Sequence, residues 1–205
     1  MKKVGITGGI GSGKTMACKV FESLGVPVYY SDVESKRLLD EDEEVKRKIV
    51  RHFGKEVLNE EGRVDRKKMA ALVFTNKKEL EVLNKIMHPA VERDFVEWVR
   101  RQKRCKYVMK EAAILFESGA NKLMDEVIVV TAPVNVRIER VMKRDRLTKE
   151  EVKERMKNQW TDGLKIYHSE YVIKNGKDRL MIPQVMKIHK KVLGPGKGNK
   201  QRAAK

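Results

Sequence analysis

The sequence is poor in cysteine and aromatic residues, and it has no long apolar run. Two of its 205 residues are cysteine, and phenylalanine, tryptophan and tyrosine together make up only 6%. Cys18 and Cys105 form no C-x-x-C pair and have no histidine pair nearby, so both are predicted to be buried, reduced thiols rather than zinc ligands. No apolar stretch approaches the roughly 18 residues of a membrane span, and the N-terminus lacks a signal-peptide pattern. These absences predict a cytoplasmic protein without membrane contact.

Positive charge, in contrast, is in excess, with a formal net charge of +17 at pH 7. Four of these charges lie in residues 194–205, which are rich in glycine and follow no regular period, so we expect a disordered basic tail there. Many other lysines and arginines alternate with acidic residues, as in residues 40–48, which is typical of solvated helix faces. A basic surface also suits polyanionic small substrates or weak nucleic-acid binding, and charge alone does not choose between them.

The most informative pattern is a glycine-rich segment near the N-terminus. Residues 8–15 read GGIGSGKT, which matches G-x-x-x-x-G-K-[ST]. A strand candidate over residues 3–7 precedes the pattern and a helical pattern over residues 16–24 follows it, which is the order that a phosphate-binding loop requires. In such a loop Lys14 reaches the β- and γ-phosphates of a bound nucleotide, and the Thr15 hydroxyl ligates Mg²⁺. The residues predicted to bind ATP are Gly9, Ile10, Gly11, Ser12, Gly13, Lys14, Thr15 and Met16.

Strand and helix patterns alternate along most of the chain. Four further strand candidates lie at residues 25–30, 106–110, 126–131 and 171–173. This alternation favours an α/β fold of the P-loop nucleotide-kinase type, with a five-stranded parallel sheet flanked by helices. We expect one domain over residues 1–193, with a core formed by 1–39 and 105–193, a helical substrate-binding insertion at 40–104 and a lid at about 144–160.

Several helices have recognisable ends. Thr148 and Glu151 form a capping-box sequence at the start of a helix that runs to Gln159. Asp65 is expected to cap a helix that ends at Phe74. The pair His88-Pro89 is expected to divide the end of the insertion into two helices, because proline disrupts a helix interior. These two helices span residues 78–87 and 90–101, and the others are expected over residues 33–39, 134–143 and 178–193.

Charged residues gather where the predicted strands end, which is the edge at which parallel sheets bind ligands. Asp32 follows the second strand, where its carboxylate would act as a general base or would cap the next helix. Arg137, Arg140 and Arg144 share one helical face and would stabilise a transferring phosphoryl group, although a solvated basic face explains at least one of them equally well. Glu111 ends the third strand and would hold a Mg²⁺-bound water or cap a loop.

Two further positions are candidates for ligand contact. His88, beside a proline in the insertion, either lines the cleft or has a structural role. Asn175, after the last strand, is expected near the adenine of the nucleotide.

A GTPase is not expected. Its D-x-x-G motif is missing, because no aspartate lies three residues before a glycine. Residues 76–79 (NKKE) approach N-K-x-D, but they fall in the helical insertion and follow no strand. Small-molecule kinases with a lid remain as the expected class of protein.

Several segments in order along the chain resemble the dephospho-coenzyme A kinase family. The phosphate loop is similar to its T-G-G-I-G-S-G-K form, and VPVYYSD at residues 26–32 is similar to its V-P-V-I-D-A-D segment. Other similar segments are RHFG at 51–54, LNKIMHP at 83–89, ILFESG at 114–119 and RVMKRD at 140–145. The resemblance covers about residues 2–190.

This resemblance implies that the ATP γ-phosphoryl group is transferred to the ribose 3′-hydroxyl of dephospho-coenzyme A, the last step of coenzyme A synthesis. It implies that Asp32 is the base, that the insertion holds the acceptor, and that the lid arginines, Arg140 and Arg144, close over the phosphates. His88 is the candidate in the insertion for contact with the acceptor. We further expect a monomer or weak homo-oligomer without a specific nucleic-acid partner. The alternatives are a kinase for a nucleoside or shikimate, and a basic nucleic-acid-binding ATPase, although few aromatic residues are available for base stacking.

The chain departs from the family pattern at three places. Tyr30 replaces the first aspartate of D-A-D. Glu111 and Ala113 stand where the family has aspartate and proline, so that Glu111 keeps the charge on a longer side chain. Thr15-Met16 replaces Ser-Thr and retains the hydroxyl expected at the metal.

Overall fold

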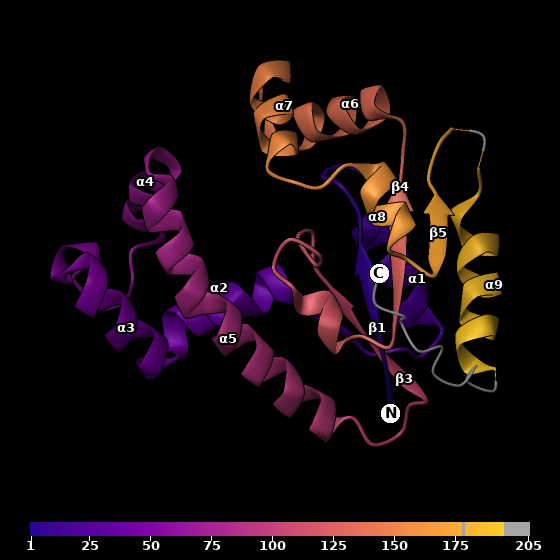
Figure 1. Ribbon diagram of the computed structural model, residues 1–205, viewed down its shortest axis with the longest axis horizontal. Helices are drawn as coiled ribbons and strands as arrows, with labels where there is room; N and C mark the ends of the chain where they lie inside the picture. Colours follow the sequence, from indigo (N-terminus) through magenta and orange to yellow (C-terminus); the bar gives the residue numbers. More distant parts are fainter. Residues whose placement is uncertain (178, 195–205) are drawn as a thin grey trace, which may run out of the picture. The chain divides into compact units, whose positions relative to one another are not determined.

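The structure, a computed structural model, describes residues 1–177 and 179–194 (Figure 1). The chain forms two compact units, one of Met1–Val28 with Arg104–Lys205 and one of Tyr29–Lys103. The second unit therefore takes in residues 29–39, which the sequence assigned to the core. The expected tail beyond residue 194 lies outside the described residues.

The first unit is built on a parallel sheet. The strands of the sheet are β1 (Lys2–Thr7), β2 (Val28–Tyr30), β3 (Tyr107–Glu111), β4 (Glu126–Thr131) and β5 (Tyr171–Lys174), in the order β2-β3-β1-β4-β5. Tyr29 and Tyr30 of β2 already belong to the second unit. β1 lies at the centre, where Val4 pairs with Met109 of β3 and Glu126 of β4. Every residue of β3 and the central residues of β4 are buried, as expected for parallel strands covered on both faces. The predicted five-stranded parallel sheet is confirmed.

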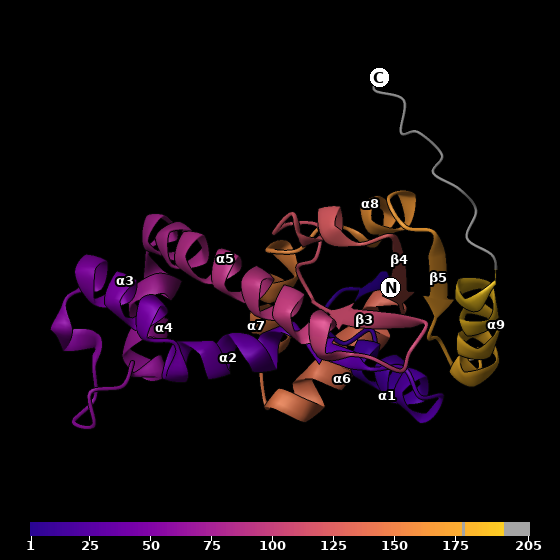
Figure 2. The same ribbon diagram turned by 90° about the horizontal axis from the view of Figure 1, so that it is seen from below.

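Helices of the first unit cover this sheet. They are α1 (Lys14–Ser23), α6 (Val134–Asp145), α7 (Lys149–Lys157), α8 (Asp162–Tyr167) and α9 (Met181–Leu193), with a 3-10 helix η2 (Ala120–Leu123). α1 buries Ala17, Cys18 and Phe21 and contacts β1, β3 and α9, while α9 runs alongside β5 (Figures 1 and 2). The predicted Thr148–Glu151 capping box is confirmed at α7.

The second unit is helical and has its own hydrophobic core. Its helices are α2 (Ser31–Glu41), α3 (Glu43–Phe53), α4 (Arg66–Thr75) and α5 (Lys77–Arg101), with a 3-10 helix η1 (Lys55–Val57). Asp42 and Asp65 cap α3 and α4 by accepting backbone N–H bonds, which confirms the cap predicted at Asp65. Val45, Ile49 and Val57 are among the buried residues of its core.

The predicted break at His88-Pro89 is wrong. α5 runs without interruption from Lys77 to Arg101 with Pro89 inside it. A proline in a helix interior costs about 3 kcal/mol because one backbone hydrogen bond is lost. Met87, Ala90 and Phe95 are buried around it, and their burial offsets this cost.

Candidate functional site

The phosphate loop connects β1 to α1, as predicted. Gly13 is the residue before α1 and has φ 96°, a left-handed conformation that favours glycine. The loop closes on itself where Ser12 N–H donates to the Gly9 carbonyl at 3.1 Å. The first N–H groups of α1 have no acceptor within their own helix, and the positive end of the helix dipole lies there, so this terminus favours an anion.

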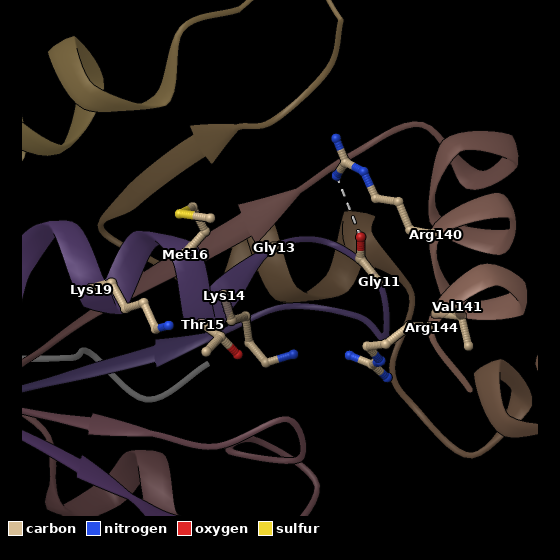
Figure 3. Close-up of a pocket in the computed structure, with 9 residues that line it drawn as sticks. All are labelled: Gly11, Gly13, Lys14, Thr15, Met16, Lys19, Arg140, Val141 and Arg144. Carbon is tan, nitrogen blue, oxygen red and sulfur yellow. Dashed lines mark hydrogen bonds between the residues drawn. The ribbon is translucent and has the colours of Figure 1, made fainter.

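A cavity of about 270 Å³ opens at the start of α1 (Figure 3). Figure 3 shows the amino group of Lys14 and the guanidinium of Arg144 facing the same space, with the Thr15 hydroxyl beside Lys14. No carboxylate lines the cavity among the described residues, so its electrostatic potential favours a polyphosphate. Its lining residues are Gly11, Gly13, Lys14, Thr15, Met16, Lys19, Arg140, Val141 and Arg144.

Lys14 is buried, and its amino group donates to the Gly8 carbonyl at 2.9 Å. The contact holds the side chain across the loop. Lys19 also lines the cavity, although the sequence analysis did not single it out. Its position one helical turn after Thr15 was the available signal, because residues four apart share a helix face.

The three arginines singled out in α6 differ in their burial and in their contacts. Arg140 and Arg144 are exposed at the cavity, and Arg140 lies 3.5 Å from the Gly11 carbonyl and 3.4 Å from the Asn175 carbonyl. Arg144 makes two hydrogen bonds to Asp145, at 2.7 and 2.9 Å, and these raise the pKa of its guanidinium. Arg137 is buried and turns toward the backbone of the loop, donating to the Ile10 carbonyl at 2.9 Å. Arg137 therefore neither lines the cavity nor belongs to a solvated basic face, whereas Arg140 and Arg144 line the cavity.

Three loop residues predicted to bind nucleotide do not line the cavity. They are Gly9, Ile10 and Ser12. The Ile10 N–H donates to the Gln159 side chain at 2.8 Å instead. The Ser12 hydroxyl is buried without a hydrogen-bond partner among the described residues.

Asn175 lies against the loop. Its side-chain amide donates to the Ser12 carbonyl at 2.8 Å, and its backbone N–H donates to the Thr131 carbonyl at 2.7 Å. A Cβ atom at Gly13 would lie 2.2 Å from this amide, so the close approach requires glycine there. Asn175 thus ties the end of β5 to the phosphate loop.

Asp32 is an exposed residue in the first turn of α2. The alternative of a capping role is wrong, because α2 already begins at Ser31 and Tyr30 occupies the N-cap position without a side-chain cap bond. Within the described residues, no hydrogen bond or ion pair involves the Asp32 carboxylate. The Asp32 carboxylate is therefore accessible from solvent.

The same helix is fixed by an ion-pair network inside the second unit. The Arg37 guanidinium donates to Glu34 and Asp94, both at 2.6 Å. The other oxygen of Asp94 accepts from the Tyr29 hydroxyl at 2.7 Å, and burial together with Asp94 raises the pKa of that hydroxyl. This network joins α2 to α5 and to the residue before Tyr30, and so it fixes the backbone that carries Asp32.

The two remaining candidates are Glu111 and His88. Glu111 is the last residue of β3 and is buried, and its charge contributes, after burial itself, to raising the pKa of the Cys18 thiol. His88 is half-buried in α5. No cluster of three His, Cys, Asp or Glu side chains suited to a metal occurs among the described residues. Cys18 is buried as predicted, whereas Cys105 is only half-buried.

The chain is similar to known proteins over most of its length. It matches the family described as Dephospho-CoA kinase over residues 2–179. Dephospho-CoA kinase of Porphyromonas gingivalis is 39% identical over 189 residues, which cover 92% of this chain and 93% of that protein. The crystal structure of TT1252 from Thermus thermophilus is 31% identical, with a TM-score of 0.83 and coverage of 95% of this chain and 98% of that one. Dephospho-CoA kinase from Campylobacter jejuni is 28% identical, with a TM-score of 0.70 and coverage of 94% and 98%. The chain belongs to the dephospho-CoA kinase family.

Proposed function

We propose that this protein transfers the γ-phosphoryl group of ATP to the ribose 3′-hydroxyl of dephospho-coenzyme A, which yields coenzyme A and ADP. The observation that carries the proposal is a phosphate loop opening on a cavity lined by lysine and arginine, in a chain of the dephospho-CoA kinase family. Four cations around one cavity match the charge of a triphosphate. No helix of the described chain is both long and apolar enough to cross a membrane, and we propose a cytoplasmic enzyme that is a monomer or a weak homo-oligomer.

The donor side of the reaction is assigned to the first unit. Lys14 leaves the Gly8 carbonyl to bind the β- and γ-phosphates. Arg140 and Arg144 reach the phosphates from α6. As charge spreads over the transferring group, their guanidinium groups neutralise it, which is the main task of a protein in phosphoryl transfer.

Asp32 is proposed as the general base. The 3′-hydroxyl oxygen attacks the γ-phosphorus, its proton passes to the Asp32 carboxylate, and the bond to the leaving ADP oxygen breaks. Two features support this role: the carboxylate is exposed, and the helix does not use it as a cap. His88 and the helical second unit are assigned to the acceptor.

Mg²⁺ is proposed as the metal that accompanies ATP. It commonly keeps several waters and takes its other ligands from phosphates and one or two protein oxygens, so the residues present fit it without a preformed cluster. The Thr15 hydroxyl lines the cavity and would be a direct ligand. Glu111, at the end of β3, would hold a metal-bound water. When bound, the ion supplies charge neutralisation at the β- and γ-phosphates.

A panel of acceptors tests the proposal. ADP release would be measured with dephospho-coenzyme A, shikimate, adenosine or single-stranded RNA added in turn. We expect turnover only with dephospho-coenzyme A, because lid closure awaits the acceptor. Turnover with shikimate or adenosine alone would favour another metabolite kinase, and stimulation by RNA would favour a nucleic-acid-dependent ATPase. Lys14→Met serves as the inactive control.

A further inference from the structure

We infer that Arg137 is a positioning residue which, with Gln159 and Asp162, couples the phosphate loop to the lid. The inference deepens the proposed function, because it rests on ATP binding at this loop. Arg137 is 4% exposed, whereas Arg140 and Arg144 of the same helix are exposed at the cavity. A buried guanidinium needs a partner for its charge and hydrogen-bond acceptors for its N–H groups. The contacts of Arg137 therefore indicate what the residue does.

The guanidinium of Arg137 makes three close approaches. Its Nε donates to the Ile10 carbonyl at 2.9 Å, and its Nη1 pairs with Asp162 Oδ1 at 2.9 Å. Its Nη2 lies so close to the loop that a Cβ atom at Gly9 would be 1.8 Å away. This position of Arg137 therefore requires glycine at residue 9, because any side chain there would displace the guanidinium.

Ile10 is held from outside the loop at each of its groups. Its carbonyl accepts from Arg137, and its N–H donates to Gln159 Oε1 at 2.8 Å. Its side chain packs against the hydrophobic cluster that joins α6 to α7, which includes Val141 and Val152. The two side chains that hydrogen-bond to the backbone of Ile10, those of Arg137 and Gln159, do not line the nucleotide cavity.

Two of the residues in these contacts lie at or just after the end of the expected lid, residues 144–160. Gln159 follows α7 and Asp162 begins α8, so the two residues stand where the chain leaves the lid. A displacement of α7 must change the contacts of Ile10, and Ile10 immediately precedes the cavity-lining Gly11. We expect nucleotide affinity to depend on Arg137 and Gln159, although neither lines the cavity.

Arg137→Met and Gln159→Met test this coupling, with Lys143→Met on the exposed face of α6 as the matched control. Calorimetry with ADP and Mg²⁺ should give a Kd raised about 10-fold in each test variant, since each loses a part-buried hydrogen bond to Ile10. The double variant should lose less than the product of the two effects, because both act on one residue. Arg137→Lys retains a donor for the Ile10 carbonyl and should recover part of the affinity.

A residue that only stabilises the fold would behave differently. Arg137→Met would then lower the melting temperature and leave the Kd for ADP unchanged. In the steady state we expect a raised KM for ATP, with kcat and the KM for dephospho-coenzyme A within about threefold of wild type. ADP affinities within twofold of wild type in both folded variants would overturn the inference. If Arg137→Met does not fold, the ADP affinity of Gln159→Met alone tests the inference. Because ADP binding needs no acceptor, a wild-type protein that binds ADP but leaves dephospho-coenzyme A unchanged would contradict only the proposed function.

Discussion

At the residue scale, the candidate site contains residues proposed to bind phosphate and residues that hydrogen-bond to the loop. Lys14 and Arg144 face the cavity, while Arg137 and Asn175 bind loop carbonyls. Both groups carry nitrogen donors, and the sequence pattern does not distinguish them. The two arginines differ in burial, because Arg137 is buried behind the loop whereas Arg144 is exposed at the cavity.

Asp32→Asn tests the proposed base. We expect kcat to fall by about 10²-fold or more, because an amide cannot accept the hydroxyl proton. The Kd for ADP should stay within about twofold, because Asp32 lies outside the residues that line the donor cavity. Glu97→Gln, at an exposed position of α5, is the control and should match wild type. A kcat for Asp32→Asn within threefold of wild type would remove Asp32 from the mechanism.

At the element scale, α9 docks on the sheet through a titratable contact. The Tyr107 hydroxyl and His189 Nδ1 are 2.7 Å apart, and burial lowers the pKa of His189 from its ordinary 6.5. Between that lowered pKa and 6.5 the unfolded chain binds more protons than the folded one. The contribution of this contact to the free energy of unfolding is therefore complete above pH 6.5. It is lost as the pH falls from 6.5 to the lowered pKa of His189.

The variant His189→Gln tests the direction of this pH dependence of stability. The variant keeps a hydrogen-bonding side chain but does not titrate, so its unfolding free energy should depend less on pH between about 7.5 and 5 than that of wild type. Urea titrations at several pH values measure the difference. Parallel curves for the two proteins would show that the contact does not carry the pH dependence.

The elements also show how far the sequence predicts this fold. Hydrophobic patterns located all five strands, and the capping box placed the start of α7. Local rules failed at α5, because burial on both sides of Pro89 outweighs the loss of one hydrogen bond. They also missed α8, whose six residues carry no apolar period, although Thr161 accepts from the Leu164 N–H as a helix cap.

The candidate site, like the fold, was predictable from the sequence only where its features are local. The loop motif identifies Lys14 and Thr15 because its chemistry is local. Gln159 contacts the loop, and Asp162 contacts Arg137. Each contact joins residues that are far apart in the sequence, so no local sequence pattern predicts it.

At the scale of the whole molecule, the two units divide the proposed chemistry. The first unit contains the phosphate loop, α6 and Asn175, so nucleotide binding is assigned to it. The second unit contains Asp32 and His88, which are proposed for the base and the acceptor. The net charge of +17 suits both substrates, since each carries several phosphate charges.

Removal of residues 195–205 tests whether the basic C-terminal segment contributes to the reaction. The last described helix ends at Leu193, with Gly194 as its cap, and the donor cavity lies elsewhere. We expect kcat and both KM values of the truncated protein to stay within about twofold, because the residues that line the donor cavity all lie between Gly11 and Arg144. A KM for dephospho-coenzyme A raised 10-fold would assign the segment to acceptor binding.

The position of the transferred phosphate is the most direct test of the proposed reaction. Wild-type protein would be incubated with ATP, Mg²⁺ and dephospho-coenzyme A, and the product examined by mass spectrometry and ³¹P NMR. We expect a product one phosphate heavier, with a new phosphomonoester on the ribose 3′-oxygen and one ADP released per product. A folded protein that binds ATP but forms no such product, or that phosphorylates another hydroxyl, would contradict the proposed reaction.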